Sequence, residues 1–361
     1  MVFNSINTSY TYLTNFSNQV TTVNQEGYHA LYGNRDFGYA NGSGSMIWLY
    51  GIASTGYANG SNSFIGLQGH NNAAFANGNG SSIRLRGSAQ AAYLNGNGTW
   101  AIVNGWDSTV VATGDDAIVY FESESYGNRA YLSGPRQSIN FFNSNNTATL
   151  LVGWSTNAYF MDNSAKNTVY IYGANEGAYD KPSSSYNTVS LLGSNETLSF
   201  AGSHNYGILN GGWTLNATIS GAYNTVDVRS INAGVSTSGA GQGNVVNLHN
   251  IHETATDFGL AETTNIFNVD SFSISGRADK HSDVQISIGR QIVNMNVTNL
   301  TKGVIYEIEG NRSVITGNAD KHINVIISSL AAYNPPVALA GGSNASILVS
   351  TSFQCPVTIA T

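Results

Sequence analysis

The densest cluster of charged residues in this chain lies between residues 115 and 136 and could support acid–base chemistry. Its members are Asp115, Asp116, Glu122, Glu124, Arg129 and Arg136. Two carboxyl groups that face one substrate can act as general acid and general base, so Asp115, Asp116 and Glu122 are candidate catalytic residues. If Asp115 or Glu122 lies across from Arg129 or Arg136, the cluster is instead a set of solvated ion pairs. The sequence leaves both interpretations open.

A second set of candidate residues comes from a hexapeptide that recurs in the C-terminal third. The two copies are Gly276-Arg-Ala-Asp-Lys-His281 and Gly317-Asn-Ala-Asp-Lys-His322, placed 41 residues apart. Lys280 or His281 could serve as a base beside Asp279 in a polysaccharide lyase or epimerase. If this separation corresponds to two turns of a stacked structure, equivalent atoms lie about 9–10 Å apart, too far to share a metal ion. We therefore expect no metal site and no cofactor, and a recurring polar loop is the alternative to a catalytic one.

A third set combines aromatic and basic side chains at alternate positions of successive strand-like segments. Its members are Trp48, Tyr50, Phe64, Arg84, Arg86 and Trp100. Aromatic faces can contact the apolar faces of pyranose rings, while arginine bonds acidic or hydroxyl groups, so these six residues are a candidate glycan-binding patch. The alternative is a covered surface, either an interface between copies of the chain or a face overlaid by a loop.

These candidates are carried by a repeat that occupies residues 38 to 105 without a gap. Its four blocks follow one another at one short, fixed spacing and run over Gly38–Gly51, Gly56–Gly69, Ala74–Gly87 and Ala92–Gly105. A short fixed period is typical of a solenoid, in which each coil buries its apolar side only against its neighbours. The sequence therefore predicts an all-β, parallel β-solenoid with capped ends.

Each coil is expected to contain two short strands and two turns. Ile47 and Leu49 alternate with polar or aromatic residues, which is the period of a strand with one buried face. For the strand that contains Tyr39 and Ala40 either parity leaves an acceptable core, so the sequence does not decide which of the two points inward. The Asn-Gly dipeptides supply the positive φ angles of a corner.

One asparagine stands at the same corner of each block. The four residues are Asn41, Asn59, Asn77 and Asn95. Stacked coils would bring their amides together, so we expect a hydrogen-bonded ladder with a structural role rather than a ligand site.

The repeat loosens after Thr109, and the coil length is expected to drift between about 18 and about 21 residues as corners accept insertions. Later strand-like segments are expected at 117–121, 138–142, 167–173, 187–193, 224–228, 244–248 and 265–269. The predicted organisation is an N-terminal β cap over residues 1–35, a regular solenoid over 36–250, and a continued solenoid or β cap with charged loops over 251–361.

The repeated Asn-Gly-rich coil resembles the β-solenoid regions of secreted and surface proteins of bacteria, such as adhesin-like and type I-exported repeat proteins. The calcium-binding β-roll, the sharpest case within this resemblance, requires an aspartate in each turn. This chain carries Ser45, Ser63, Ser81 and Thr99 in the corresponding column. Because these residues supply no carboxylate, we expect no calcium in the regular part.

Composition and charge narrow the partners. Only 10% of the residues are charged, and the formal net charge is -7, which argues against nucleic acid and anionic membranes as main partners. No apolar run is long enough to span a bilayer. The start of the chain lacks a secretory signal, so we expect either a removed signal or export without a cleaved one.

The expected function is that of a secreted or cell-surface structural or adhesive solenoid that binds a polysaccharide or cell-surface glycan, or copies of itself. The alternative is a polysaccharide-active lyase, hydrolase or epimerase working along a solenoid groove. The sequence does not decide between a catalytic and a non-catalytic protein, and it leaves the oligomeric state and the handedness of the coil open.

Overall fold

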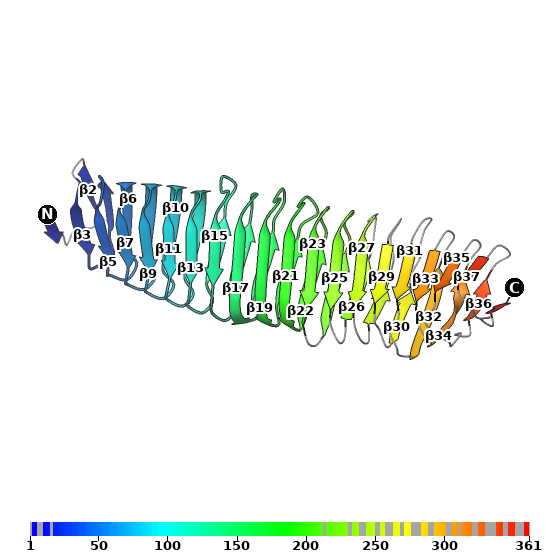
Figure 1. Cartoon of the computed structure of the whole chain (residues 1–361). Coiled ribbons are helices and arrows are strands. Elements are labelled where there is room, and N and C mark those ends of the chain that lie inside the picture. Colours follow the sequence, from blue (N-terminus) through cyan, green and yellow to red (C-terminus); the bar gives the residue numbers. More distant parts are fainter. Residues whose placement is uncertain are drawn as a thin grey trace. The chain divides into compact units, whose positions relative to one another are not determined.

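The structure is a computed structural model, shown in Figure 1. It describes residues 17–211, 214–229, 233–237 and 243–249, and outside these ranges the backbone of the strands alone. The chain divides into two units, Met1–Gly177 and Ala178–Thr361. Within the described residues every regular element is a β-strand. Odd-numbered and even-numbered strands belong to two different sheets, here called the odd sheet and the even sheet.

The first unit contains strands β1 to β19 and the first residue of β20. The strands of its odd sheet are β1 (Val2–Ser5), β3 (Gln19–Val23), β5 (Phe37–Ala40), β7 (Thr55–Ala58), β9 (Ala73–Ala76), β11 (Ala91–Leu94), β13 (Thr109–Ala112), β15 (Arg129–Leu132), β17 (Thr147–Trp154) and β19 (Thr168–Ala174). Those of its even sheet are β2 (Tyr10–Thr14), β4 (Tyr28–Tyr32), β6 (Met46–Ile52), β8 (Phe64–His70), β10 (Ser82–Ser88), β12 (Trp100–Trp106), β14 (Ile118–Phe121), β16 (Ser138–Phe141) and β18 (Asn157–Phe160), while β20 (Gly177–Asp180) crosses the boundary between the units.

The second unit alternates between the two sheets in the same way. Its odd strands are β21 (Thr188–Ser194), β23 (Tyr206–Asn210), β25 (Thr225–Arg229), β27 (Val245–His249), β29 (Thr263–Phe267), β31 (Asp283–Ser287), β33 (Ile305–Glu309), β35 (Asn324–Ser328) and β37 (Ser346–Ser350). Its even strands are β22 (Glu196–Phe200), β24 (Leu215–Ile219), β26 (Ala233–Thr237), β28 (Glu253–Thr256), β30 (Ser271–Ser275), β32 (Ile292–Leu300), β34 (Arg312–Ala319), β36 (Val337–Gly341) and β38 (Val357–Ala360).

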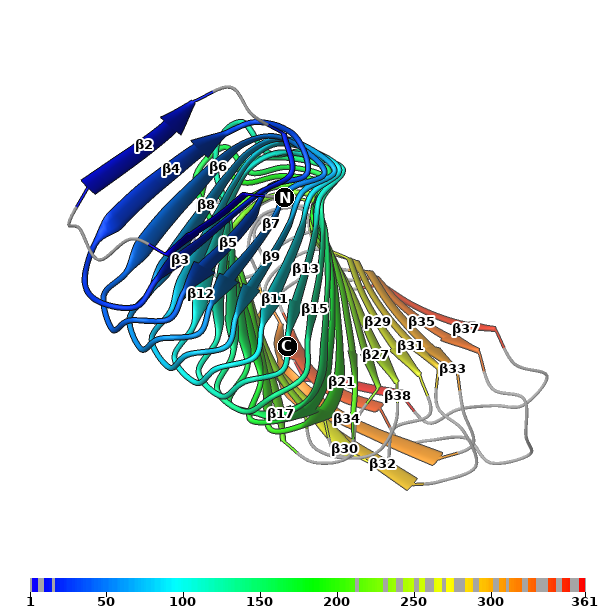
Figure 2. The same cartoon turned by 90° about the vertical axis from the view of Figure 1, so that its left-hand side faces the viewer.

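Within each unit, strands pair in parallel with the strand two places along the chain, so one coil consists of one odd and one even strand. Figure 2 looks along the first unit and shows β4, β6 and β8 in one layer and β5, β7 and β9 in the other. The register places Ile47 opposite Ile65 and Ile65 opposite Ile83, which is the period of the sequence repeat. Later coils are longer, since Phe121 pairs with Phe141 and Thr147 with Thr168. The predicted parallel β-solenoid is therefore confirmed, with two strands to a coil.

The core lies between the two sheets and is filled by complementary sizes of side chain. Ile47 and Leu49 of the even sheet are fully buried, as is Ala40 of the odd sheet. This settles the parity that the sequence left open, because Tyr39 points outward and is only half-buried. A Cβ added at Gly56 would lie 2.5 Å from Ile65 Cγ2. The small residues of the odd sheet thus provide the space into which the isoleucines of the even sheet pack.

The predicted asparagine ladder is present at the exposed corner. The Nδ2 of Asn59 donates to Asn41 Oδ1 at 2.8 Å, Asn77 donates to Asn59 at 2.8 Å, and Asn95 donates to Asn77 at 2.9 Å. The buried Ser/Thr column next to it also bonds corner carbonyls, since Ser81 Oγ donates to Gly60 O at 2.8 Å. Both columns close the corner rather than hold a ligand.

A second ladder, which the sequence analysis missed, runs through the opposite corner and is buried. There the backbone N–H of one residue donates to the side-chain oxygen of its equivalent in the next coil, as from Ser54 to Asn72 Oδ1 at 2.8 Å. The same donation links Ser108 to Asn128, Asn128 to Asn146 and Asn146 to Asn167 in the first unit, and Asn187 to Asn205, Asn205 to Asn224 and Asn224 to Asn244 in the second. These bonds satisfy backbone donors that would otherwise be buried without a partner.

In three of the four repeat blocks the backbone conformation of the closing residue requires glycine. Gly51, Gly69 and Gly87 have φ angles of 149°, 131° and 119°. A Cβ at Gly69 would lie 1.9 Å from Gly51 O, so the stacking of the corners leaves no space for a side chain.

Strands of the first 35 residues join the same ladders, because β3 pairs with β5 and β4 with β6. The division into a cap over 1–35, a regular solenoid over 36–250 and a C-terminal segment over 251–361 stays a prediction.

The buried ladder yields a stability prediction. Replacing Asn72 by alanine leaves the buried N–H of Ser54 and the carbonyl of Gly51 without the partners they have now, at 2.8 and 3.1 Å. We expect Asn72→Ala to lower the free energy of unfolding by about 2 kcal/mol, measured by urea denaturation. The matched control is Asn59→Ala in the exposed ladder, where water replaces the lost bonds and the loss stays below about 1 kcal/mol. Equal losses in the two variants would contradict a special role for the buried ladder.

Candidate functional site

The six residues of the predicted glycan-binding patch all lie on the outer side of the even sheet in the first unit. Three columns cross this face from coil to coil. They contain Met46, Phe64, Ser82 and Trp100 in the first, Trp48, Gly66, Arg84, Ile102 and Tyr120 in the second, and Tyr32, Tyr50, Gln68, Arg86 and Asn104 in the third. The register therefore brings the predicted residues onto one surface, as the alternation of the strands implies.

Trp48 occupies the centre of this surface, and its indole is covered on more than one side. A Cβ added at Gly66 would lie 2.3 to 2.6 Å from three atoms of the indole, so the ring lies against the glycine of the next coil. The guanidinium of Arg86 lies 5.6 Å from the ring centroid, within the range of a cation–π contact. Phe64 packs at 5.3 Å with a tilt of 49°. Trp48 is therefore half-buried and in contact with Gly66, Arg86 and Phe64, and its role in glycan binding stays a prediction.

The tyrosines at the N-terminal side of the surface pack against one another. The rings of Tyr32 and Tyr50 stack with centroids 4.4 Å apart and planes 8° apart. Burial and the neighbouring hydroxyls of Tyr28 and Tyr32 raise the pKa of Tyr50 to about 12, although Arg86 acts in the opposite direction. Its hydroxyl accordingly remains a hydrogen-bond donor at neutral pH.

A shallow depression of about 510 Å³ opens on the same face at its C-terminal side. It is lined by Ile102, Tyr120, Glu122, Ser123 and Phe142. Tyr120 pairs in register with Ile102, which places both on the outer side of β12 and β14. Phe142 follows β16 and is 40% exposed. Sequence analysis missed Tyr120 and Phe142, although continuing the outward columns past Trp100 at the coil spacing identifies Tyr120.

Glu122 is fixed at the edge of this depression by one donor from each of the two preceding coils. Arg84 Nη2 lies 3.2 Å from Glu122 Oε2, and Asn104 Nδ2 donates to the same oxygen at 3.2 Å. The side chains of Arg84 and Glu122 are 29% and 32% exposed. Both contacts go to Oε2, so Oε1 accepts a hydrogen bond from neither Arg84 nor Asn104.

The other carboxylates of the predicted catalytic cluster form ion pairs elsewhere. Arg136 Nε donates to Asp116 Oδ1 at 2.6 Å, and its Nη2 lies 3.7 Å from Asp115 Oδ2. The guanidinium of Arg136 holds the pKa of the Asp116 carboxyl below its usual value, mainly through this hydrogen bond. This is the ion-pair arrangement weighed in the sequence analysis, and it joins Arg136 to both aspartates.

Glu122 does not belong to the same group. Asp115 and Asp116 precede β14 and Glu122 follows it, and a strand rises about 3.3 Å per residue, so the strand Ile118–Phe121 spans about 13 Å. Paired carboxylates of glycosidases are about 5–10 Å apart. Neither the ion pairs nor this separation tests catalysis, and the assignment of catalytic roles stays a prediction. The remaining candidates Asp279, Lys280 and His281 lie outside the described residues, as do Asp320, Lys321 and His322 of the second copy of their motif.

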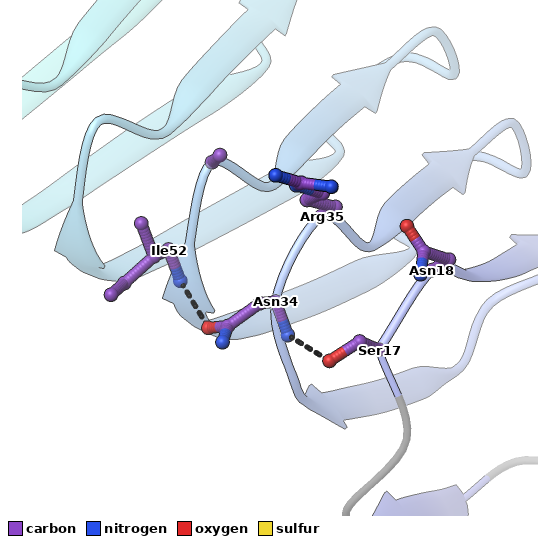
Figure 3. A pocket seen from close by; sticks show the side chains of 6 residues that line it. Ser17, Asn18, Asn34, Arg35 and Ile52 are labelled. Carbon is purple, nitrogen blue, oxygen red and sulfur yellow. Dashed lines mark hydrogen bonds between the residues drawn. The ribbon is translucent and has the colours of Figure 1, made fainter.

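A second depression, of about 320 Å³, lies at a corner of the first unit and is shown in Figure 3. Its walls come from successive coils at the same corner, and Arg35 points away from the two hydrogen bonds drawn. Asn34 Oδ1 accepts from the backbone N–H of Ile52 at 2.9 Å, and the N–H of Asn34 donates to Ser17 Oγ at 3.4 Å. Two hydrogen bonds therefore join the lining of this depression across successive coils.

The second unit buries two carboxyl groups in its interior. Asp180 accepts hydrogen bonds from Ser184 Oγ at 2.8 Å and Asn205 Nδ2 at 2.7 Å, and burial nevertheless raises its pKa to about 6. Glu196 is fully buried, with Oε1 next to Gly211. Burial raises the pKa of Glu196 to about 7, against the lowering effect of a backbone hydrogen bond from Gly193. Burial therefore favours the protonated, neutral form of both carboxyl groups in the folded chain.

Nowhere among the described residues do three or more histidine, cysteine, aspartate or glutamate side chains gather as a metal ion would require. The same part of the chain contains no helix of the length and apolarity needed to cross a membrane.

Compared with known proteins, the chain matches no family model, and neither a curated protein nor a solved structure is significantly similar to it.

From the two buried carboxyl groups we expect the thermal stability of the protein to fall as pH rises. Their pKa values rise from 3.8 and 4.5 to about 6 and about 7 on folding. A raised acid pKa means that the folded state binds the proton more tightly, so this stabilisation is complete at pH values below the unfolded pKa and is lost as pH rises through the folded pKa. We expect the Tm to be lower at pH 8 than at pH 5 by about 5 °C or more, measured by circular dichroism.

Glu196→Gln removes one of the two titrating groups and should reduce this pH dependence, while Glu124→Gln, at an exposed corner of the first unit, should leave it unchanged. A Glu196→Gln variant whose Tm falls with pH as steeply as that of the wild type would contradict this account.

Proposed function

We propose that the protein is a secreted or cell-surface structural β-solenoid that binds polysaccharide on the outer face of the even sheet of its first unit. One observation carries the proposal. This face combines the exposed guanidinium of Arg86, held over Trp48, with a depression lined by aromatic and aliphatic side chains. Aromatic surfaces and convergent polar groups are the features by which concave sites recognise small rings.

The architecture supports a structural role. A stack of coils joined by continuous ladders is a rigid support, and binding residues carried by strands keep their positions better than residues on loops. The resemblance of the Asn-Gly-rich coil to secreted and surface repeat proteins of bacteria supports the proposed location. In this proposal Trp48 contributes to binding by holding Arg86 in place through the contact at 5.6 Å.

The proposal predicts which substitutions weaken binding. We expect Arg86→Ala and Trp100→Ala each to reduce the fraction of protein retained on a polysaccharide that binds the wild type, by about fivefold or more, because a few anchoring side chains carry most of the binding energy. Retention is measured by co-sedimentation with insoluble polysaccharides and by affinity electrophoresis in gels that contain soluble ones.

The matched control is Tyr131→Ala, which removes an aromatic side chain that is 41% exposed on the odd sheet. Its retention should equal that of the wild type, and circular dichroism verifies that all variants are folded. If no polysaccharide in a panel of neutral and acidic polymers retains the wild type, or if Tyr131→Ala is as impaired as the other two, the proposal is wrong.

A further inference from the structure

The depression beside β14 has the composition of a subsite for a sugar ring. Tyr120 and Ile102 are half-buried and Phe142 is 40% exposed, so they present apolar surface that is in contact with solvent. Its volume of about 510 Å³ lies within the range of sites that hold small molecules. Exposed apolar side chains gathered in a concave place, with a charged group at the edge, are the usual makeup of such a site.

The charged group is Glu122, and its orientation is set before any ligand arrives. Arg84 lies on the strand two coils earlier in the even sheet, and Asn104 on the strand between, and both contact Glu122 Oε2 at 3.2 Å. A carboxylate oxygen that already accepts from both has little remaining capacity, whereas Oε1 retains its lone pairs. An acceptor fixed in this way binds a donor without the entropy cost of ordering its own side chain.

We propose that this depression binds one neutral pyranose ring of a polysaccharide, with Glu122 Oε1 accepting hydrogen bonds from ring hydroxyls and Tyr120 and Phe142 contacting the apolar side of the ring. The inference rests on the proposed function and names the class of ligand and the subsite. A carboxylate only accepts hydrogen bonds, so it selects groups that donate them. Hydroxyl groups satisfy this requirement.

An acidic sugar fits the depression less well than a neutral one. A uronate carboxylate placed here would meet Glu122, a group of like charge, while the guanidinium of Arg84 is already engaged by that carboxylate. An acidic sugar would instead pair its carboxylate with the guanidinium of Arg86, which lies over Trp48 in the third column. The two possible ligand classes therefore depend on different residues of one face.

The test measures binding of defined oligosaccharides to the full chain by isothermal titration calorimetry. The probes are the neutral hexasaccharides cellohexaose, mannohexaose and maltohexaose, and the acidic hexagalacturonate. We expect at least one neutral probe to bind, and we expect Glu122→Gln and Phe142→Ala each to raise its Kd by about tenfold or more. In Glu122→Gln the single amide oxygen faces the donors Arg84 and Asn104, so an NH2 donor replaces the acceptor Oε1, and Phe142→Ala removes the apolar contact to the ring. The matched control Glu124→Gln changes an exposed carboxylate that does not line the depression, and should leave the Kd unchanged.

The outcomes separate this inference from the proposed function. Binding of a neutral probe that is weakened in Glu122→Gln and Phe142→Ala, and not in Glu124→Gln, supports the subsite. Binding that depends on Arg86 and is indifferent to Glu122 and Phe142, with either kind of probe, overturns the subsite and leaves the proposed function standing. Retention of the wild type by no polysaccharide and binding of no probe overturn both. Circular dichroism of each variant establishes that a lost affinity is not lost folding.

Discussion

Parallel pairing of successive coils in register is the constraint on which the rest of the structure depends. It places Ile47 beside Ile65 and Ile65 beside Ile83, and it aligns the remaining columns of these strands in the same manner. Neighbouring strands lie about 4.8 Å apart, so each side chain meets its equivalent at close range. Residues that can pack against or hydrogen-bond to an identical residue are favoured there, such as asparagine at a corner, glycine where backbones touch and aliphatic residues in the core. The small content of charged residues follows from the same requirement.

Several charged groups of the stack either have a partner of opposite sign or are buried where the neutral form is favoured. Arg136 reaches Asp116 between corners of adjacent coils, and Arg84 crosses an entire coil to reach Glu122. Asp180 and Glu196 face the interior of the second unit, and burial raises their pKa values. A charge inside the stack would lack both solvent and a counter-charge, so proton uptake is the remaining solution.

The candidate surface arises from breaks in the ladder rather than from its regular part. Gly66 interrupts a column of larger residues and gives the indole of Trp48 a place to lie, and this positions Arg86 above it. Where the columns stay regular, as for Tyr39, Tyr57, Phe75 and Tyr93, the rings stack on one another with centroids 4.7 to 5.0 Å apart. Rings in such a stack cover each other's faces and present their edges. Irregular columns are therefore the places where this fold can offer a site.

The solenoid, its coil length, the inward positions of Ile47 and Leu49 and the amide ladder that contains Asn41 could all be predicted from the amino-acid sequence. The reason is that each of them follows from the period of the repeat and from the alternation of residues within it. Only the tertiary structure decided which parity buries Ala40, how the corner at Asn72 satisfies its backbone, and that Glu122 is held by Arg84. Contacts of this kind depend on how far a side chain reaches over neighbouring coils and on which space those coils leave open. A linear pattern records the order of the residues and their spacing, whereas the depression beside Tyr120 exists only once successive coils are stacked.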